Sequence, residues 1–303
     1  MGSPTIDDAW RPVFAGSEWQ AEGEAILAAL RESGAAVKDL YDRAAAATYA
    51  KTDGSPVTDA DLAADAIIRR VLAERFPDDA LLTEEGQDGE ARLRSRRCWI
   101  ADPIDGTQQF VERTGNFDIL IALAVDGRPV VAGALQPPTD TTCVAIAGGG
   151  AWLAEGNANP VRVRFPAKDT AQPVVGTSIW FGAPENLDAL GDIASRLGGR
   201  AVGESRIGFT PRTFVEPLWC DLLLGFRLGA EQFMAYEWDF AVGDLFLHEA
   251  GGVLTDLDGE AFRYNRPRPT FERGLVAATS RSLHARALAA TRAELAARGV
   301  AGF

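Results

Sequence analysis

The stretch "WIADPIDGT", residues 99–107, constrains this chain more than any other. An apolar run ends at Asp102, and proline, Ile104 and Asp105 follow at once. Asp, Pro and Gly all favour turns, so a surface turn is the simplest interpretation. Proline also holds the residue before it extended, which would make Asp102 project from the end of a buried strand. The stretch therefore predicts a strand that ends either in a turn or in a cradle for hard cations.

The composition narrows the function classes. The chain has 303 residues, of which 47% are apolar and 24% charged, as in one large or two ordinary globular domains. Its 43 acidic and 30 basic residues give a net charge of -13, which argues against binding to a nucleic acid polymer. Three widely spaced cysteines and two histidines disfavour zinc sites, disulfide frameworks and histidine-based catalysis.

The chain start lacks the basic-then-apolar pattern of a signal peptide. The longest apolar runs are also shorter than the roughly 20 residues of a membrane span. We therefore expect a cytoplasmic protein with no membrane partner.

Hydrophobic periodicity predicts helices over residues 18–50 and from Thr58, as the N-cap, to just before Pro77. Asp61 stands where the acid of a capping box belongs. Short strands are expected in "ALLTEEG" and "RCWIAD", and three more between Asp118 and Trp152. A further helix should begin at Asp239 and end at Gly251-Gly252.

Near residue 165 the pattern of predicted elements changes. Strands such as "PVVGTSIW" now alternate with helices such as "PENLDALGDIASRLG". This alternation predicts an α/β second half over residues 166–303.

Acidic residues recur at the ends of these predicted elements: Asp61, Glu84, Asp102, Asp105 and Asp239. Each one alone has a simple explanation, as a helix cap or an exposed acid. Together they supply the carboxylate oxygens that Mg²⁺ prefers. The Ile104 carbonyl can face the same cavity. Gly106 and Thr107 are expected to begin a helix whose N–H groups point at a bound phosphate.

The segments "GSPVTDAD", "LLTEEG", "WIADPIDGTQQFVERTGNFDILIAL" and "WDFAVGDLFLHEAGG" together resemble the inositol monophosphatase family of metal-dependent, lithium-sensitive phosphatases. The resemblance spans roughly residues 20–300. "KTDGSPVTDAD" and "ERTGNFDILIAL" are most similar to its 3'(2'),5'-bisphosphate nucleotidase branch. The family implies an α/β (α+β) fold of alternating layers of helix and sheet, as in inositol monophosphatase and fructose-1,6-bisphosphatase. It also implies a metal-binding α+β half over residues 1–165 and an α/β half over residues 166–303 that completes the site. Two or three Mg²⁺ ions and often a homodimer are typical of the family.

The resemblance also implies residue roles. Glu84, Asp102, Asp105 and the Ile104 carbonyl would bind magnesium, and Asp239 would bind a second ion. Asp61 and Thr107 would orient a metal-bound water as the nucleophile. The metals would lower the pKa of this water and neutralise the phosphate oxygens.

The implied activity is a Mg²⁺-dependent phosphomonoesterase that acts on a small phosphorylated metabolite. The substrate expected in general terms is an inositol phosphate-like monoester. A 3'-phosphoadenosine nucleotide, histidinol phosphate and a sugar bisphosphate are alternative substrates. A binding protein that keeps the fold without activity is disfavoured, because Asp61, Glu84, Asp102, Asp105, Thr107 and Asp239 are all present.

The substrate-facing part departs from the family. An inserted segment, "ESRIGFTPRTF", contributes Arg206 and Arg212. A guanidinium pairs well with a second phosphate or a carboxylate of the substrate. The alternative is that both arginines are solvated surface residues.

Overall fold

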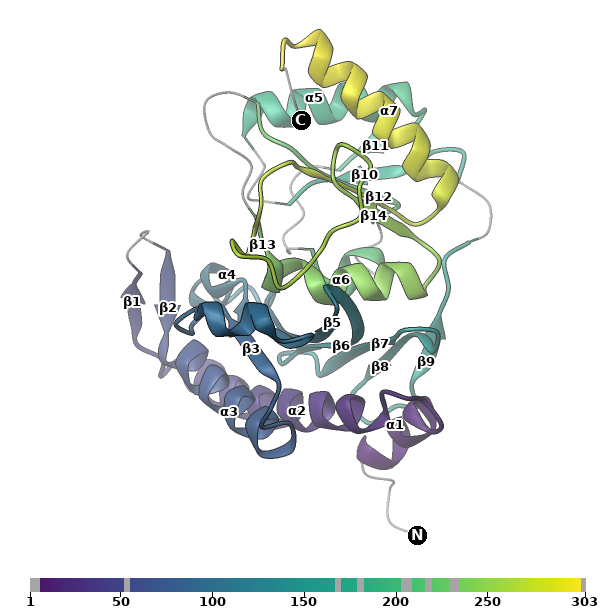
Figure 1. Ribbon diagram of the computed structural model, residues 1–303. Helices are drawn as coiled ribbons and strands as arrows, with labels where there is room; N and C mark the ends of the chain where they lie inside the picture. Colours follow the sequence, from purple (N-terminus) through teal and green to yellow (C-terminus); the bar gives the residue numbers. More distant parts are fainter. Residues whose placement is uncertain are drawn as a thin grey trace.

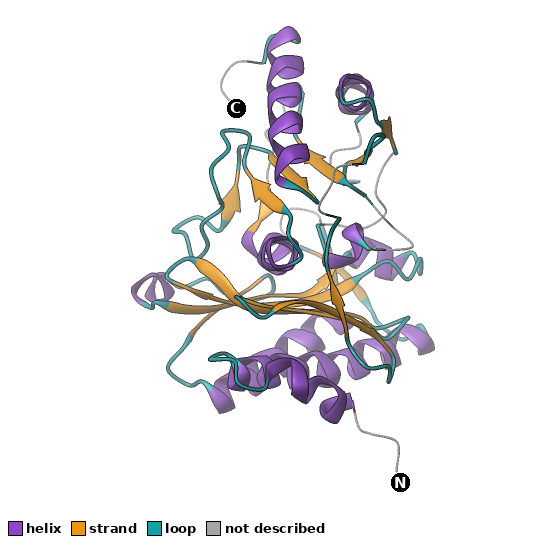
Figure 2. Cartoon of the chain, turned by 90° about the vertical axis from the view of Figure 1, so that its right-hand side faces the viewer, coloured by secondary structure: helices purple, strands orange, loops and turns teal. Residues whose placement is uncertain are grey.

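Five layers of alternating helix and sheet make up the computed structural model, which describes residues 6–51, 55–166, 170–178, 183–202, 209–215, 220–228 and 235–300. Figure 1 shows a helical layer on the outer face of a large sheet, a helix between that sheet and a smaller one, and a second helical layer beyond the smaller sheet. The view in Figure 2 shows the same order of layers edge-on. The predicted α/β layered fold class is confirmed.

The large sheet contains seven strands in chain order, and only its first pair, β3 and β4, is parallel. Its strands are β3 (Ala80–Thr83), β4 (Arg97–Asp105), β5 (Asp118–Val125), β6 (Arg128–Gln136), β7 (Thr141–Ile146), β8 (Gly150–Glu155) and β9 (Val161–Val163). The outer face is covered by α1 (Ile6–Phe14), α2 (Gln20–Arg43) and α3 (Asp59–Arg75). Side chains from these helices and from one face of the strands form a continuous apolar core.

The smaller sheet has the order β11-β10-β12-β16-β14. Its strands are β10 (Val174–Gly176), β11 (Arg200–Ala201), β12 (Leu222–Gly225), β14 (Val253–Thr255) and β16 (Leu275–Ala278). Helices α5 (Pro184–Arg196) and α7 (Arg281–Ala297) cover its outer face. Helix α6 (Glu237–Glu249) lies between the two sheets and contacts both of them.

Short elements complete the description: β1 (Thr48–Ala50), β2 (Pro56–Thr58), η1 (Glu90–Arg94), α4 (Thr107–Val111), η3 (Pro211–Phe214), β13 (Ala235–Tyr236) and β15 (Thr270–Phe271). β1 pairs with β2, and β13 pairs with β15. The division into halves at residue 165 stays a prediction, since α6 from the second half packs on the sheet of the first.

The helix expected over residues 18–50 is too long. α2 ends at Arg43, and Ala44 takes a left-handed conformation with a φ of 49°. Thr48 to Ala50 then form β1, an exposed strand paired with β2. The alanine-rich run from Ala44 has a high helix propensity, but the three residues that follow it pair with β2, and the helix ends before the run.

The described residues include no helix with the length and apolar character of a membrane span. Cys98, Cys143 and Cys220 are buried free thiols, and burial raises the pKa of each one. Thiols in such surroundings are unreactive, so these three serve as small core residues.

Candidate active site

The end of β4 carries two of the predicted carboxylates. The strand runs through the Asp-Pro-Ile-Asp segment, but its register with β5 shifts between Asp102 and Asp105. The Asp102 Oδ1 atom accepts the Ile104 N–H at 2.9 Å, which fixes the Asp102 side chain. Gly106 then turns the chain into α4 with a φ of 98°, a left-handed conformation that favours glycine. A Cβ there would lie 3.0 Å from Gln109 Oε1 and 3.1 Å from the Asn116 carbonyl oxygen.

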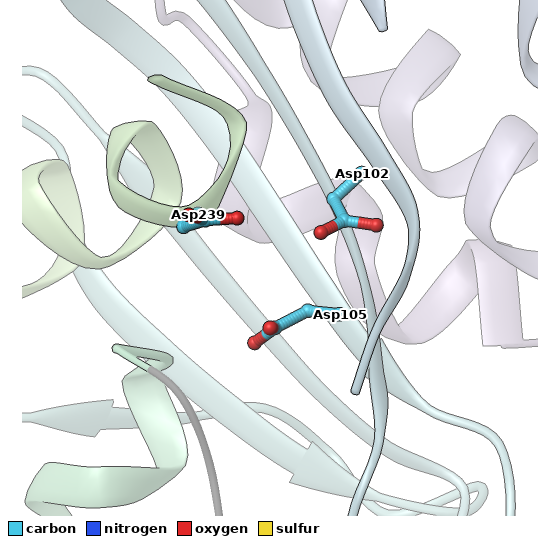
Figure 3. Close-up of side chains that lie close together, drawn as sticks. All are labelled: Asp102, Asp105 and Asp239. Atoms are coloured by element: carbon cyan, nitrogen blue, oxygen red, sulfur yellow. The ribbon is translucent and has the colours of Figure 1, made fainter. Parts of the chain in front are cut away.

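Asp239 reaches the same place from the first turn of α6. Ligand oxygens of Asp102, Asp105 and Asp239 all lie within 4.8 Å of one another. Figure 3 shows the three carboxylates gathered in the space between β4 and the start of α6. The expectation that α6 begins at Asp239 is wrong by two residues. The helix begins at Glu237, and the Asp239 Oδ2 atom accepts the Tyr236 N–H at 2.9 Å as the acid of a capping box.

The start of α6 is held by a buried acid next to Asp239. The Glu237 carboxylate is fully buried and accepts the Asn265 and Arg266 N–H groups at 2.6 and 2.8 Å. Arg92 of η1, in the first half of the chain, donates to the Asn265 side chain at 2.8 Å. These bonds tie the first turn of α6, which carries Asp239, to the segment at Asn265 and through it to η1.

Three carboxylates at this separation, one buried and two half-buried, repel one another strongly. Burial raises the pKa of Asp102 well above its ordinary value, and the negative charges of Glu84 and Asp105 raise it further. Burial also raises the pKa of Asp105, and the negative charge of Asp239 raises it further. For Asp239 burial, opposed by the Tyr236 hydrogen bond, raises the pKa to about 7. A group that compensates these charges is therefore expected in the site.

Glu84 follows β3 and is adjacent to this cluster. Lys51, at the end of β1, donates to Glu84 Oε1 and to Glu85 Oε1, both at 2.6 Å. Burial lowers the pKa of Lys51, but the attraction and hydrogen bonds of the two glutamates outweigh it, so the pKa is raised. The sequence reasoning missed Lys51, because a lone lysine in a loop carries no signal of its own.

Asp61 and Thr107 form a hydrogen-bonded pair. The Thr107 hydroxyl lies 2.9 Å from Asp61 Oδ1 and 3.2 Å from the Ile104 carbonyl oxygen. The other Asp61 oxygen accepts the Thr58 N–H at 2.8 Å, so the predicted capping box is confirmed. Burial raises the pKa of Asp61. The pair therefore joins the start of α3 to the turn after β4.

Arg212 is buried, with 7% of its surface exposed, so the solvated-surface interpretation is wrong for this residue. Its Nε and Nη2 atoms donate to the two oxygens of Asp118, at 2.8 and 2.7 Å. The bidentate contact expected with a substrate anion is thus made with a carboxylate of the same chain. Arg206 lies outside the described residues.

The donor set fits Mg²⁺. It consists of carboxylate oxygens and a backbone carbonyl, and it includes no histidine or cysteine. The like charges of Asp102, Asp105 and Asp239, crowded within 4.8 Å, are what a divalent cation would neutralise.

Known proteins give the class to which this site belongs. A profile of the inositol monophosphatase family matches residues 19–296, so the chain belongs to this family. The 3'(2'),5'-bisphosphate nucleotidase CysQ of Salmonella typhimurium is 32% identical over 258 residues, which cover 82% of this chain and 95% of that protein. The Nus factor SuhB of Escherichia coli is 29% identical over 204 residues, which cover 67% and 72% of the two chains.

Solved structures share the fold. CysQ from Bacteroides thetaiotaomicron superposes with a TM-score of 0.71 at 24% identity, over 86% of this chain and 98% of that one. Inositol monophosphatase from Anabaena gives a TM-score of 0.65 at 21% identity, over 93% and 100% of the two chains. The predicted family is therefore confirmed, and so is the prediction of a phosphatase of this family.

Proposed function

We propose that this chain is a Mg²⁺-dependent phosphomonoesterase. The observation that carries the proposal is the carboxylate cluster of Asp102, Asp105 and Asp239 beside the Asp61–Thr107 pair. Glu84, the three aspartates and the Ile104 carbonyl would hold two or three magnesium ions. When bound, the ions would neutralise phosphate oxygens and lower the pKa of the attacking water.

The chain's own residues would handle the proton of that water. Because Thr107 donates its hydroxyl hydrogen to Asp61, its oxygen lone pairs are directed to accept a hydrogen bond from water. The raised pKa of Asp61 makes this carboxylate a stronger base than an exposed aspartate. The Gly106 and Thr107 N–H groups would bind a phosphate oxygen and orient the group for in-line attack.

A 3'(2'),5'-bisphosphate nucleotide is the substrate that we propose. The similarity to CysQ over 95% of that protein supports it, as does the local sequence "ERTGNFDILIAL". An inositol monophosphate is the second candidate, favoured by the fold shared with an inositol monophosphatase. Histidinol phosphate is a third substrate to include in the assay.

Phosphate release from a panel of these compounds tests the proposal. Wild-type protein should hydrolyse adenosine 3',5'-bisphosphate with a kcat/KM at least about tenfold above that for inositol 1-phosphate, in the presence of Mg²⁺. EDTA should abolish release from every compound. Release that persists in EDTA would contradict the metal dependence, and a preference for inositol 1-phosphate would select the second candidate.

Several properties stay predictions: inhibition by lithium, a homodimer, a cytoplasmic location and the absence of a nucleic acid polymer as partner. The last of these predictions needs a direct test, because the chain is similar to a protein named as a Nus factor. Filter binding of RNA at physiological salt would decide it, with no retention expected for a chain of net charge -13.

A further inference from the structure

The Arg212–Asp118 ion pair lies between the two halves of the chain. Asp118 is the first residue of β5 in the large sheet, and Arg212 belongs to η3 in the second half. Both side chains are buried, with 2% and 8% of their surfaces exposed. The two donors of the guanidinium match the two carboxylate oxygens in the fork geometry that makes arginine pairs strong.

The pair lies next to a proposed magnesium ligand. In the antiparallel ladder between β4 and β5, Asp118 is the partner of Asp105, immediately after the irregularity that separates Asp102 from Asp105. Directly opposed residues of an antiparallel pair project from the same face of the sheet, so the Asp118 carboxylate and the guanidinium bound to it lie beside Asp105. Both charges are therefore felt at the carboxylate cluster.

Loss of one partner from a buried ion pair changes the local electrostatic field in a predictable way. A buried carboxylate and guanidinium that face each other cancel most of their field, but removal of one partner leaves an uncompensated charge in a medium of low dielectric constant. An uncompensated guanidinium beside Asp105 would oppose the binding of any cation there. Arginine cannot avoid this by losing its proton, since its pKa is too high.

We propose that Arg212 is a positioning residue of the metal site: together with Asp118 it holds η3 against the start of β5, and the pair leaves no unmatched charge beside Asp105. Arg212 then serves the metal site through Asp118 and does not bind the substrate. The inference rests on the proposed function, because it takes Asp105 to be a magnesium ligand. It also gives the inserted segment around residue 212 a role other than substrate recognition.

The test measures Mg²⁺ binding without substrate, by calorimetry on the EDTA-treated and desalted full-length chain. Asp118→Asn has the shape of aspartate but leaves the guanidinium unmatched, so the dissociation constant should rise about tenfold or more. The double variant Asp118→Asn/Arg212→Gln removes both charges and should bind Mg²⁺ within about threefold of wild type. A pair that matters only for packing would show the opposite order, with the double variant at least as impaired as the single one.

Asp79→Asn provides a matched control. Asp79 also forms a two-donor pair with an arginine, because Arg97 donates to its two oxygens at 2.7 and 3.0 Å. Arg97 begins β4, at the opposite end of the strand from Asp102 and Asp105. This variant should lower the melting temperature but leave the Mg²⁺ dissociation constant within about twofold of wild type.

Three results would overturn the inference. The first is an unchanged Mg²⁺ dissociation constant in Asp118→Asn. The second is a double variant that folds but binds Mg²⁺ more than about tenfold weaker than wild type, and this criterion holds even if the single variant does not fold. The third is a rise in KM for adenosine 3',5'-bisphosphate but not for inositol 1-phosphate in the double variant Asp118→Asn/Arg212→Gln at saturating Mg²⁺, since that would return Arg212 to substrate binding.

These outcomes are separate from the fate of the proposed function. A wild-type chain that binds Mg²⁺ but hydrolyses no compound of the panel would end the proposed activity and leave the role of Arg212 intact. Suppose instead that the wild-type chain hydrolyses the bisphosphate and that Asp118→Asn has normal Mg²⁺ affinity. The proposed activity would then stand, and the role of Arg212 would be refuted.

Discussion

Replacing Asp239 by asparagine should stabilise the metal-free protein while it impairs the metal-loaded one. Burial raises the pKa of Asp239 to about 7 in the folded chain, from an ordinary value of 3.8. Between these two values the folded state holds a proton that the unfolded state has released. The free energy of unfolding therefore falls as the pH rises from about 4 to about 7, and it is level above that. An asparagine side chain at this position would remove the penalty and still accept the Tyr236 N–H through its oxygen.

The size of the effect follows from the same two values. The interval from 3.8 to about 7 is roughly three pKa units and corresponds to about 4 kcal/mol for a rigid site. Relaxation of the site reduces this, so we expect Asp239→Asn to raise the free energy of unfolding at pH 8 by about 2–4 kcal/mol. The melting temperature should then rise by roughly 4–10 °C. At pH 5 only the part of the penalty between pH 3.8 and 5 has developed, so the gain should be less than half as large.

Urea unfolding of EDTA-treated protein at pH 5 and pH 8 measures these changes. Addition of Mg²⁺ at about 100 times its dissociation constant should stabilise the wild type by about 2.7 kcal/mol per site and the variant by clearly less. An Asp239→Asn protein that is less stable than wild type at pH 8 without metal would refute the reasoning. An equal gain at pH 5 and pH 8 would do so too, because it would show that ionisation of Asp239 is not the cause.

Three further predictions concern catalysis and cations. Thr107→Ala should lower kcat by about 10²-fold and change the Mg²⁺ dissociation constant by less than threefold, as measured by steady-state kinetics and calorimetry, whereas Thr107→Ser should retain most of the activity. Lys51→Met should lower the melting temperature of the metal-free protein, because Glu84 and Glu85 lose their shared cation, and should enlarge the rise on adding Mg²⁺ in a thermal shift assay. Calcium in place of Mg²⁺ should support less than about 1% of the phosphate release, since its longer bonds and higher coordination number loosen in-line geometry, and lithium should inhibit in the millimolar range.

The parts of the site that the sequence predicts are those with local determinants. Asp102 and Asp105 are three residues apart at the end of an apolar run, so one strand end places both. The Thr58–Asp61 capping box is likewise encoded within four residues. The position of Asp239 was predicted less well, because Tyr236 takes the N-cap position through its extended backbone and not through a typical capping side chain.

Contacts between distant segments could not be predicted in this way. Lys51 and Glu84 are 33 residues apart, and Arg212 and Asp118 are 94 residues apart. Glu84 is recognisable at the end of a predicted strand, but nothing in the local pattern indicates its contact with Lys51 or distinguishes Lys51, Arg212 and Asp118 from solvated residues. The same limit explains the helix expected over residues 18–50, because the pairing of β1 with β2 overrides the alanine-rich sequence near Ala44.

One feature of the geometry links the local signals to the function. Asp61, Asp102 and Asp239 each use one carboxylate oxygen to accept a backbone N–H two or three residues away, at 2.8, 2.9 and 2.9 Å. Each bond fixes a side-chain rotamer, so the direction of the second oxygen is set by the backbone before any ion or water binds. Burial raises the pKa of each of these acids, and the charges of neighbouring acids raise it further, because the fixed rotamers keep the carboxylates from rotating apart. The short spacing that made these residues recognisable in the sequence is therefore also what keeps the site assembled against its own charge.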